Sequence, residues 1–319
     1  EAGGVVTIRI GDSRTRAREL DPESVDCIVT SPPYWGLRSY LASDDPDKAH
    51  EMGAEPTLGE YVANLVGLFR DLRRALKPMG VAWLNIGDSY SAGGAGIRTS
   101  HPQQSRNGQQ GVVGPRDKHP SASRANRTGF TDFGGLKPKD LCLVPYRVAL
   151  ALQDDGWWLR SHTIWAKPNP MPESVTDRPT SSHEAVFLLT RSESYWYDAD
   201  AVKEKATSDQ GRGATGRGRQ AYNGAQSSPS QDHSGWMGGD GETRNLRNVW
   251  TIPTRPYTGS HYAVMPPALA ERCVLSGCPA GGLVLDPFGG SGTVGEAAEK
   301  YGRRWLLFDL DARNEALMR

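Results

Sequence analysis

The chain has 319 residues, 37% of them hydrophobic, and its 37 Lys and Arg residues balance 37 Asp and Glu residues. This length suffices for one substantial core or for two domains. No apolar run approaches ~18 residues and no signal-peptide pattern occurs, which excludes a membrane-spanning segment and favours a cytoplasmic protein.

Alternating strands and helices are predicted along the first 90 residues. The β-branched and apolar residues at 5–10 and 25–29 predict two strands, each followed by a polar turn. Residues 61–76 predict a helix closed by the Lys-Pro-Met-Gly sequence at 77–80, and residues 81–86 predict a third strand. Strands that alternate with helices favour an α/β fold with a mostly parallel sheet.

Two stretches interrupt this pattern. Residues 91–130 and 203–247 are rich in Gly, Ser and Arg, which predicts loop-rich surface insertions. Basic residues outnumber acidic ones between 91 and 139, and a locally basic surface is what contact with phosphates requires. The candidate DNA-binding residues are Arg124 and Arg127 in the first stretch and Arg212, Arg217 and Arg219 in the second.

The end of the chain carries a strand, a glycine turn and a helix in succession. Residues 283–286 predict a short buried strand, three glycines follow between 289 and 292, and residues 294–300 predict a helix. Glycines let a ligand approach the backbone closely, and the free N–H groups of a helix start attract polar or anionic groups. Asp309 follows a further predicted strand at 305–308 and can accept hydrogen bonds from ribose hydroxyls. The arrangement predicts a nucleoside-type ligand.

The order of these motifs constrains the sheet. Only eight residues follow Asp311, so strands from the start of the chain must complete the sheet that the last strands begin. Ligands bind at the carboxyl ends of the strands in such sheets. We therefore expect one edge to collect the residues that follow the strands: Asp12, Ser31, Asp88, Asp286 and Asp309.

The turn Ser31-Pro32-Pro33-Tyr34 suits a reaction at the exocyclic amine of a base. Such an amine is a poor nucleophile because its lone pair is delocalised into the ring. A site that accepts hydrogen bonds from both amine hydrogens holds the nitrogen toward tetrahedral geometry. The Ser31 hydroxyl and the Pro32 carbonyl are natural acceptors, since two prolines give a stiff turn without backbone donors. Tyr34 can stack on a base that has left the duplex, and Asp88 either accepts from the amine or caps a turn.

Cysteines and tryptophans are expected mainly in the interior. The four cysteines form no C-x-x-C pair, which predicts buried free thiols and no metal site. Trp35 either supports Tyr34 from behind or contacts DNA. The tryptophans expected to pack in the core are Trp157, Trp158, Trp165 and Trp196.

Combined motifs carry a family resemblance. The sequences TSPPYW at 30–35, DPFGGSGT at 286–293 and WLLFDLD at 305–311, in this circularly permuted order, resemble the β-class amino-methyltransferases of DNA, which use S-adenosylmethionine. Further landmarks are KPNP at 167–170, SSHE at 181–184 and HYAVMP at 261–266. The resemblance implies a Rossmann-like methyltransferase fold with helices on both faces of the sheet, formed by residues 1–90, 131–202 and 248–319.

The resemblance also implies roles for individual residues. The catalytic site would comprise Ser31, Pro32, Pro33, Tyr34 and Asp88. Asp286 and the glycine turn would meet the methionine end of the cofactor, with Phe288 beside the sulfonium, Asp309 at the ribose and Asp12 near the adenine. The complete set of implied cofactor contacts is Asp12, Thr30, Asp286, Pro287, Phe288, Gly290, Ser291, Gly292, Thr293 and Asp309. Residues 203–247 occupy the place of the family's target-recognition region, and the insertion at 91–130 could share that task.

The resemblance predicts a site-specific methyltransferase of double-stranded DNA, with a restriction endonuclease as a candidate partner. A serine before Pro-Pro-Tyr is more typical of enzymes that make N4-methylcytosine, whereas aspartate or asparagine is more typical of N6-adenine enzymes. Carbon-5 methylation is disfavoured because it needs a cysteine nucleophile, and the chain has no Pro-Cys pair. The alternatives are an N6-adenine enzyme, a non-catalytic DNA-binding relative, and an NAD-dependent dehydrogenase suggested by G-x-G-x-x-G at 290–295.

Overall fold

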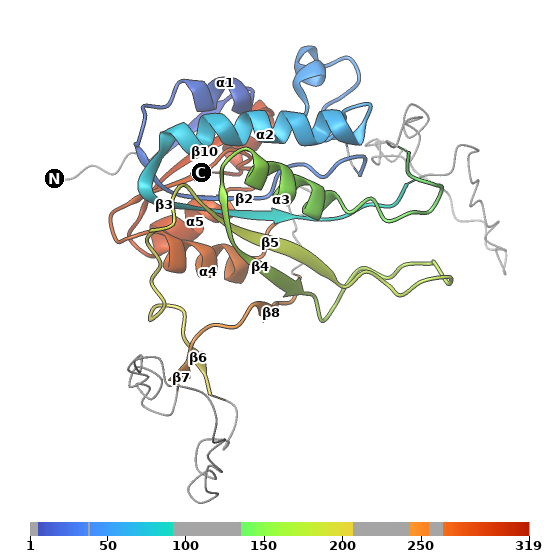
Figure 1. Cartoon of the computed structure of the whole chain (residues 1–319). Coiled ribbons are helices and arrows are strands. Elements are labelled where there is room, and N and C mark those ends of the chain that lie inside the picture. Colours follow the sequence, from blue (N-terminus) through green and yellow to red (C-terminus); the bar gives the residue numbers. More distant parts are fainter. Residues whose placement is uncertain (1–5, 38, 92–134, 207–242, 255–263, 319) are drawn as a thin grey trace, which may run out of the picture.

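An eight-stranded sheet forms the centre of the molecule, with the order β1-β10-β9-β2-β3-β5-β4-β8 (Figure 1). The computed structural model describes residues 6–37, 39–91, 135–206, 243–254 and 264–318. The strands are β1 (Val6–Ile10), β2 (Val25–Thr30), β3 (Leu76–Ile86), β4 (Trp158–Ala166), β5 (His183–Thr190), β8 (Val249–Thr251), β9 (Leu283–Asp286) and β10 (Arg304–Asp309). The helices are α1 (Ser13–Arg18), α2 (Leu58–Ala75), α3 (Val144–Asp154), α4 (Pro267–Gly277) and α5 (Thr293–Lys300), with 3-10 turns η1 (Pro46–His50) and η5 (Ala312–Ala316).

The first five strands in the sheet order are parallel. β1 pairs with β10 from Val6↔Trp305 to Ile10↔Asp309, and β9 joins β10 to β2. β5 runs antiparallel to both β3 and β4, and β8 pairs parallel with β4. The α/β fold with a mostly parallel sheet is thus confirmed, and strands from both ends of the chain build it as the motif order required.

Helices cover both faces of the sheet. α1, α2 and α3 lie on one face, and α4 and α5 lie on the other (Figure 1). Helix α2 begins with a capping box between Thr57 and Glu60, and buries one apolar stripe against the sheet. The buried side chains of that stripe are Leu58, Tyr61, Leu65, Leu68, Phe69, Leu72 and Ala75.

The helices leave neighbouring strands β9 and β2 in opposite directions. β2 leads through α2 to β3 on one face, whereas β9 leads through α5 to β10 on the other. Such a reversal of strand order opens a crevice at the carboxyl ends of the two strands, which is where α/β sheets bind ligands. The fold therefore positions the proline turn after β2 beside the glycine turn after β9.

Three expectations about local structure need correction, and one is confirmed. The strand predicted at 81–86 begins earlier, at Leu76, because Leu76 already pairs with Val25, and residues 77–80 lie in a bulge before Val81 pairs with Cys27. Trp158 is 43% exposed, since β8 covers β4 only from Ile164 onward, and Trp196 is 40% exposed in the loop after β5. All four cysteines are buried free thiols, as predicted, and burial raises the pKa of Cys278 to about 12.

Candidate active site

The carboxyl edge of the parallel strands joins the two turns directly. The Thr30 hydroxyl, at the end of β2, donates to Asp286 Oδ1 at the end of β9 over 2.7 Å. Farther along the edge, the Gly11 amide donates to the Asp309 carbonyl over 2.7 Å, and Ser13 Oγ donates to the Pro287 carbonyl. Residues that are more than 250 positions apart in the chain therefore form one continuous surface, as predicted from the motif order.

The glycine turn is shaped by the chain's own C-terminal segment. Gly292 has φ +82°, and a Cβ added there would lie 2.9 Å from the Met318 Cα. A Cβ at Gly289 would lie 2.8 Å from the Met318 sulfur. The absence of a side chain at these two glycines makes room for Met318 behind the turn. Gly290, with φ +53°, donates its amide to Asp309 Oδ2 over 2.8 Å, which closes the turn against β10.

Asp286 is a buried carboxyl group whose Oδ1 accepts from Thr30 Oγ1 and from the Phe288 amide. Among the residues that the structure describes, no donor reaches its Oδ2. Burial raises the pKa of Asp286 to about 7, and the nearby Asp309 charge adds to the rise, while the two hydrogen bonds oppose it. A cationic ligand group at Oδ2 would restore the charged form, so this carboxyl group fits the positive methionine end of S-adenosylmethionine.

The other two predicted cofactor acids are held within the protein. Asp309 Oδ1 accepts from the Asp311 amide and from Asn314 Nδ2, in addition to the contact of Oδ2 with Gly290. Asp12 caps α1 by accepting from the Arg14 amide and also pairs with the Arg14 guanidinium at 2.9 Å. Both carboxylates lie at the predicted edge, and their contacts with ribose and adenine stay predictions.

The proline turn is anchored from below. The Tyr61 hydroxyl of α2 donates to the Pro33 carbonyl over 2.9 Å. No donor reaches the Pro32 carbonyl within the described part of the chain, which keeps it available as an acceptor. Trp35 is buried, at 2% exposure, and its indole N–H donates to the Glu55 carbonyl. The structure thus resolves the two interpretations of Trp35 in favour of a supporting role.

Tyr34 is fixed by hydrogen bonds that the sequence did not reveal. Its hydroxyl donates to Glu184 Oε2 over 2.6 Å and lies 3.3 Å from both Ser31 Oγ and Asn85 Oδ1. Glu184 in turn pairs with Lys167. Both residues belong to the quoted KPNP and SSHE landmarks. Lys167 reaches this edge because β4 ends there, and Glu184 reaches it because the antiparallel strand β5 begins there. The two landmarks were the signal in the sequence that could have indicated Lys167 and Glu184 as site residues. Their position beside Tyr34 was not predicted, because the pairing of β3 with β5 was not predicted.

Asp88 caps a helix. Its Oδ1 accepts from the Ser89 amide and, over 3.0 Å, from the Val144 amide at the start of α3. The residue before that helix, Leu143, offers no side-chain cap, so Asp88, in the segment after β3, satisfies an otherwise unpaired N–H of the first helical turn. Burial raises the pKa of Asp88, and these hydrogen bonds oppose the rise. The structure shows the capping role, and contact with the amine stays a prediction.

We expect Gly87→Ala to reduce the predicted methyl transfer by about 10- to 100-fold, because a methyl group there displaces the Tyr34 ring from its predicted position on the base. An added Cβ would lie 2.5 Å from Tyr34 Cε2, and the hydroxyl of that ring is tied to Glu184. Single-turnover rates with DNA measure the effect. Gly67→Ala is the control, since nothing lies within 4 Å of its Cβ, and it should leave the rate unchanged. A Gly87→Ala rate equal to that of the control would contradict the expectation.

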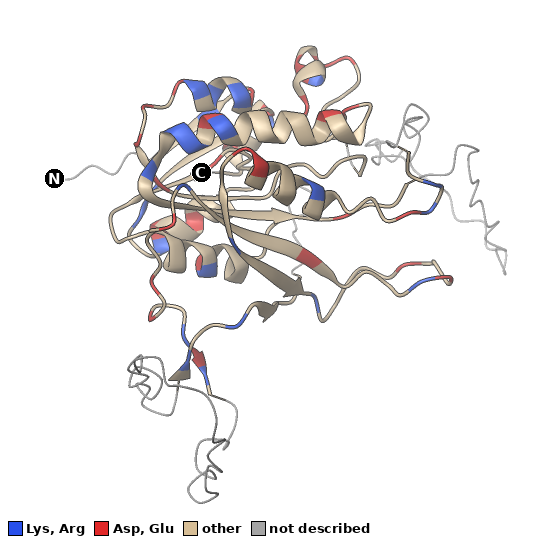
Figure 2. Cartoon of the chain, viewed as in Figure 1, with Lys and Arg blue, Asp and Glu red and all other residues tan. Residues whose placement is uncertain are grey.

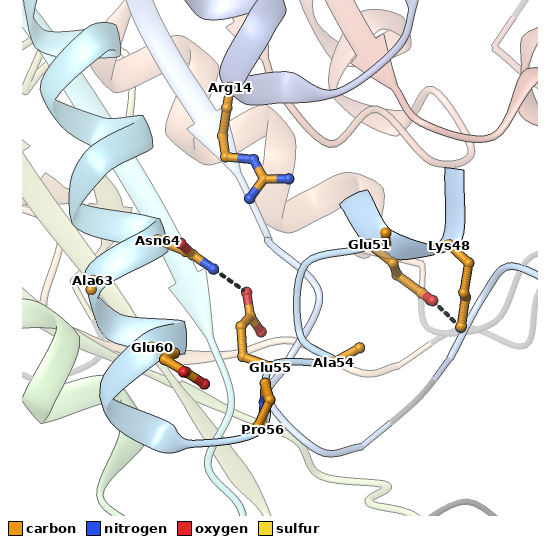
Figure 3. Close-up of a pocket in the computed structure, with 10 residues that line it drawn as sticks. Arg14, Lys48, Glu51, Ala54, Glu55, Pro56, Glu60, Ala63 and Asn64 are labelled. Atoms are coloured by element: carbon orange, nitrogen blue, oxygen red, sulfur yellow. Dashed lines mark hydrogen bonds and ion pairs between the residues drawn. The ribbon is translucent and has the colours of Figure 1, made fainter. Parts of the chain in front are cut away.

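A cavity of about 460 Å³ lies beside this edge, between η1 and the start of α2 (Figure 3). Charged groups line much of it, including Arg14, which reaches over from α1. Asn64 donates to Glu55 and Lys48 pairs with Glu51 within the lining. Sites for nucleosides and bases are mostly apolar with a few polar contacts. We assign neither the base nor the cofactor to this cavity.

A family model for DNA methylases that act on N6 or N4 amines matches residues 25–317. The chain belongs to this family. It is 42% identical over 310 residues to the type II methyltransferase M.SmaI of Serratia marcescens, covering 97% of this chain and 88% of that protein. It is 39% identical to M.Cfr9I of Citrobacter freundii, covering 96% and 83%. The solved PvuII DNA methyltransferase (cytosine-N4-specific) superposes with a TM-score of 0.60 at 17% identity, covering 98% of this chain and 84% of that one.

Membership of the DNA methylase family confirms the resemblance to amino-methyltransferases of DNA and excludes the dehydrogenase alternative. The glycine pattern at 290–295 therefore belongs to a methylase turn. Among the described residues, no helix is both long and apolar enough to cross a membrane, and no three metal-ligating side chains gather at one place.

The described basic residues of this methylase are largely occupied within the fold. Figure 2 shows Lys and Arg concentrated on α1 and on the second half of α2. Arg18 pairs with Asp71, and Arg74 donates to carbonyls at the end of α1. The last turn of α2 precedes β3, so these arginines lie toward the amino ends of the strands, away from the site. The predicted DNA contacts Arg124, Arg127, Arg212, Arg217 and Arg219 lie outside the described residues.

Proposed function

We propose that this DNA methylase transfers a methyl group from S-adenosylmethionine to the N4 amine of a cytosine flipped out of duplex DNA. The observation that carries the proposal is the hydrogen bond between Thr30 and Asp286 at the reversal point of the sheet. It holds the predicted base turn and the predicted cofactor turn side by side, as direct transfer between two bound ligands requires.

S-adenosylmethionine is the methyl donor, and it supplies an electrophilic methyl group on a sulfonium. In our proposal Asp286 Oδ2 holds its cationic methionine end. Thr30 keeps that carboxyl group oriented, and Phe288 borders the sulfonium, where an aromatic face stabilises a cation. The remaining predicted contacts are Asp12, Pro287, Gly290, Ser291, Gly292, Thr293 and Asp309.

The chain's own contribution to the reaction is to orient the amine. Ser31 Oγ and the Pro32 carbonyl accept the two amine hydrogens, which aims the nitrogen lone pair at the methyl carbon. The nitrogen–carbon bond forms as the carbon–sulfur bond breaks, which leaves S-adenosylhomocysteine, and the nitrogen then loses one proton to water. Tyr34 stacks on the flipped base, which offsets part of the few kcal/mol that unstacking costs. Asp88, whose carboxylate caps α3, is also a predicted residue of the catalytic site.

Cytosine is favoured over adenine by the residue before the two prolines. Ser31 is the residue typical of the N4-cytosine enzymes in the family resemblance, whereas this chain has neither aspartate nor asparagine there. The same pocket architecture serves N6-adenine enzymes, so the base identity rests on Ser31.

The two insertions are the proposed DNA-reading parts. Residues 203–247 form the proposed target-recognition region, and its ends meet in a ribbon of β6 (Glu204–Lys205) and β7 (Thr243–Arg244). Glu204 pairs with both Arg244 and Arg247 at the base of that ribbon. The insertion at 91–130 supplies further phosphate contacts, and residues 1–90, 131–202 and 248–319 form the catalytic domain. A cognate restriction endonuclease is the proposed functional partner.

Nucleoside analysis tests the base assignment. The chain is incubated with S-adenosylmethionine and a plasmid library of random sequence, and the digested nucleosides are identified by mass spectrometry. We expect N4-methylcytosine within one short sequence context. N6-methyladenine would move the assignment to adenine, and the absence of any methylated nucleoside would favour a non-catalytic relative.

A further inference from the structure

Five polar side chains form one connected network beside the proline turn. The Tyr34 hydroxyl lies 2.6 Å from Glu184 Oε2, and Ser31 Oγ lies 3.3 Å from that hydroxyl. Glu184 Oε2 also accepts from Asn85 Nδ2 over 3.0 Å, while Oε1 pairs with Lys167. The Glu184 and Lys167 side chains are only 14% and 18% exposed, so water competes little for these contacts.

The charges in this network determine which atom donates to which. A carboxylate only accepts, so the single Tyr34 hydrogen points to Glu184, which is closer than the Asn85 oxygen at 3.3 Å. Burial and the Glu184 charge raise the pKa of Tyr34, so the phenol stays protonated. The face of the Tyr34 oxygen toward Ser31 then carries lone pairs. Ser31 must donate its hydrogen to Tyr34, which leaves its own lone pairs for another ligand.

We propose that Glu184, held by Lys167, is a positioning residue that fixes the hydrogen-bond direction from Ser31 through Tyr34, so that Ser31 offers only acceptor lone pairs to the base. This inference rests on the proposed function, in which Ser31 Oγ accepts a hydrogen bond from the amine of the target base. It adds a rule of substrate selection. A base with an amino group at the reacting position donates to Ser31, whereas a carbonyl oxygen, as in uracil or thymine, faces lone pairs.

An isosteric change should reverse this direction. In Glu184→Gln the Lys167 ammonium captures the one remaining oxygen, which turns the amide NH₂ toward Tyr34. The same NH₂ faces Asn85 Nδ2, and the Asn85 amide turns over to relieve that clash, which directs its own NH₂ at Tyr34. Tyr34 then accepts from both amides and donates to Ser31, so Ser31 presents a hydrogen to the amine. We expect the single-turnover rate of methyl transfer to fall by about 100-fold, because a donor now faces a donor. Melting temperature and affinity for S-adenosylmethionine are measured alongside.

A second substitution tests whether Glu184 acts by setting the hydrogen-bond direction or only by holding the Tyr34 ring in place. Tyr34→Phe keeps the ring but removes the atom that relays the direction, and alone it should slow transfer by only about 3- to 10-fold. In Glu184→Gln/Tyr34→Phe the reversed relay is gone, so the rate should rise about 10-fold above that of Glu184→Gln. A double variant as slow as Glu184→Gln, or a Glu184→Gln enzyme with the wild-type rate, overturns the inference.

The preference for cytosine over uracil at the target position gives an independent test. It needs only Tyr34→Phe, so it remains possible if Glu184→Gln does not fold. Affinities are compared for duplexes with cytosine or uracil at the target position found by nucleoside analysis. The wild-type preference for cytosine should narrow by about 10-fold in Tyr34→Phe, because Ser31 regains a free hydrogen. An unchanged preference overturns the inference. If the target proves to be adenine, the same test uses hypoxanthine in place of uracil, and failure of the wild type to methylate any base refutes the proposed function instead.

Discussion

Ser31→Ala is expected to lower the single-turnover rate of methyl transfer by about 100- to 1000-fold while leaving cofactor affinity unchanged. The Ser31 hydroxyl is the proposed acceptor for one amine hydrogen, and its only hydrogen bond among the described contacts is the one to Tyr34. The cofactor turn is held by Thr30 instead, so its shape should survive. Transfer of tritiated methyl groups to DNA and calorimetric titration with S-adenosylmethionine measure the two quantities.

Ser24→Ala is the matched control for that change. Ser24 precedes the opposite end of β2 and donates to the Asp21 carbonyl at the surface. The control should keep the wild-type rate. Equal rates in Ser31→Ala and Ser24→Ala would remove Ser31 from the proposed mechanism. Loss of cofactor affinity in Ser31→Ala would show that Ser31 contacts S-adenosylmethionine instead of the base.

Asp286→Asn is expected to weaken S-adenosylmethionine binding by about 10- to 100-fold at pH 8. The asparagine oxygen can still accept from Thr30 and from the Phe288 amide, so the turn should keep its hydrogen bonds. What is lost is the negative charge opposite the cationic methionine end. Calorimetric titration of both proteins gives the affinities, and an unchanged dissociation constant would exclude contact between Asp286 and that end of the cofactor.

The pH dependence of cofactor binding should report the same carboxyl group. Burial is the main reason why the pKa of Asp286 is raised to about 7, so the group is neutral below that pH and negative above it. A cationic ligand prefers the negative form, so affinity should fall as pH drops through 7, and binding near pH 7 should release a proton. Titration in buffers of different ionisation enthalpy measures that proton. Asp286→Asn is the control, since it retains the titration of the ligand and loses that of the site.

The parallel half of the sheet followed from local sequence. Strands β1, β2, β9 and β10 are short runs of β-branched and apolar residues that end at polar turns, and such runs have few other conformations that bury them. The expected edge followed because parallel neighbours end at the same side. The reason for two of the glycines could not be predicted from the sequence. Gly289 and Gly292 make room for Met318, and only the folded structure brings these residues into contact.

The reversed direction of β5, the one antiparallel strand of the eight-stranded sheet, could not be inferred from the same signals. Glu184 stands at the start of β5, and a strand's first residue reaches the ligand edge only where the strand runs against its neighbours. Nothing local in the sequence specifies that direction. Asp88 illustrates a similar limit, because its partner is the amide of Val144 on a helix 56 positions later. Trp158 was expected in the core from its residue type, but exposure depends on where β8 stops covering β4.

The sheet order has a consequence for how the protein is made. β10 and β9 lie between β1 and β2, although β1 and β2 are separated by only a short helix in the chain. On the ribosome, β1 and β2 emerge early and must wait for the strands that will stand between them. Pairing across such long separations is slow, and both turns of the site flank those late strands. The predicted cofactor site is therefore complete only once β10 has left the ribosome, and we expect modification of DNA to begin only after that point.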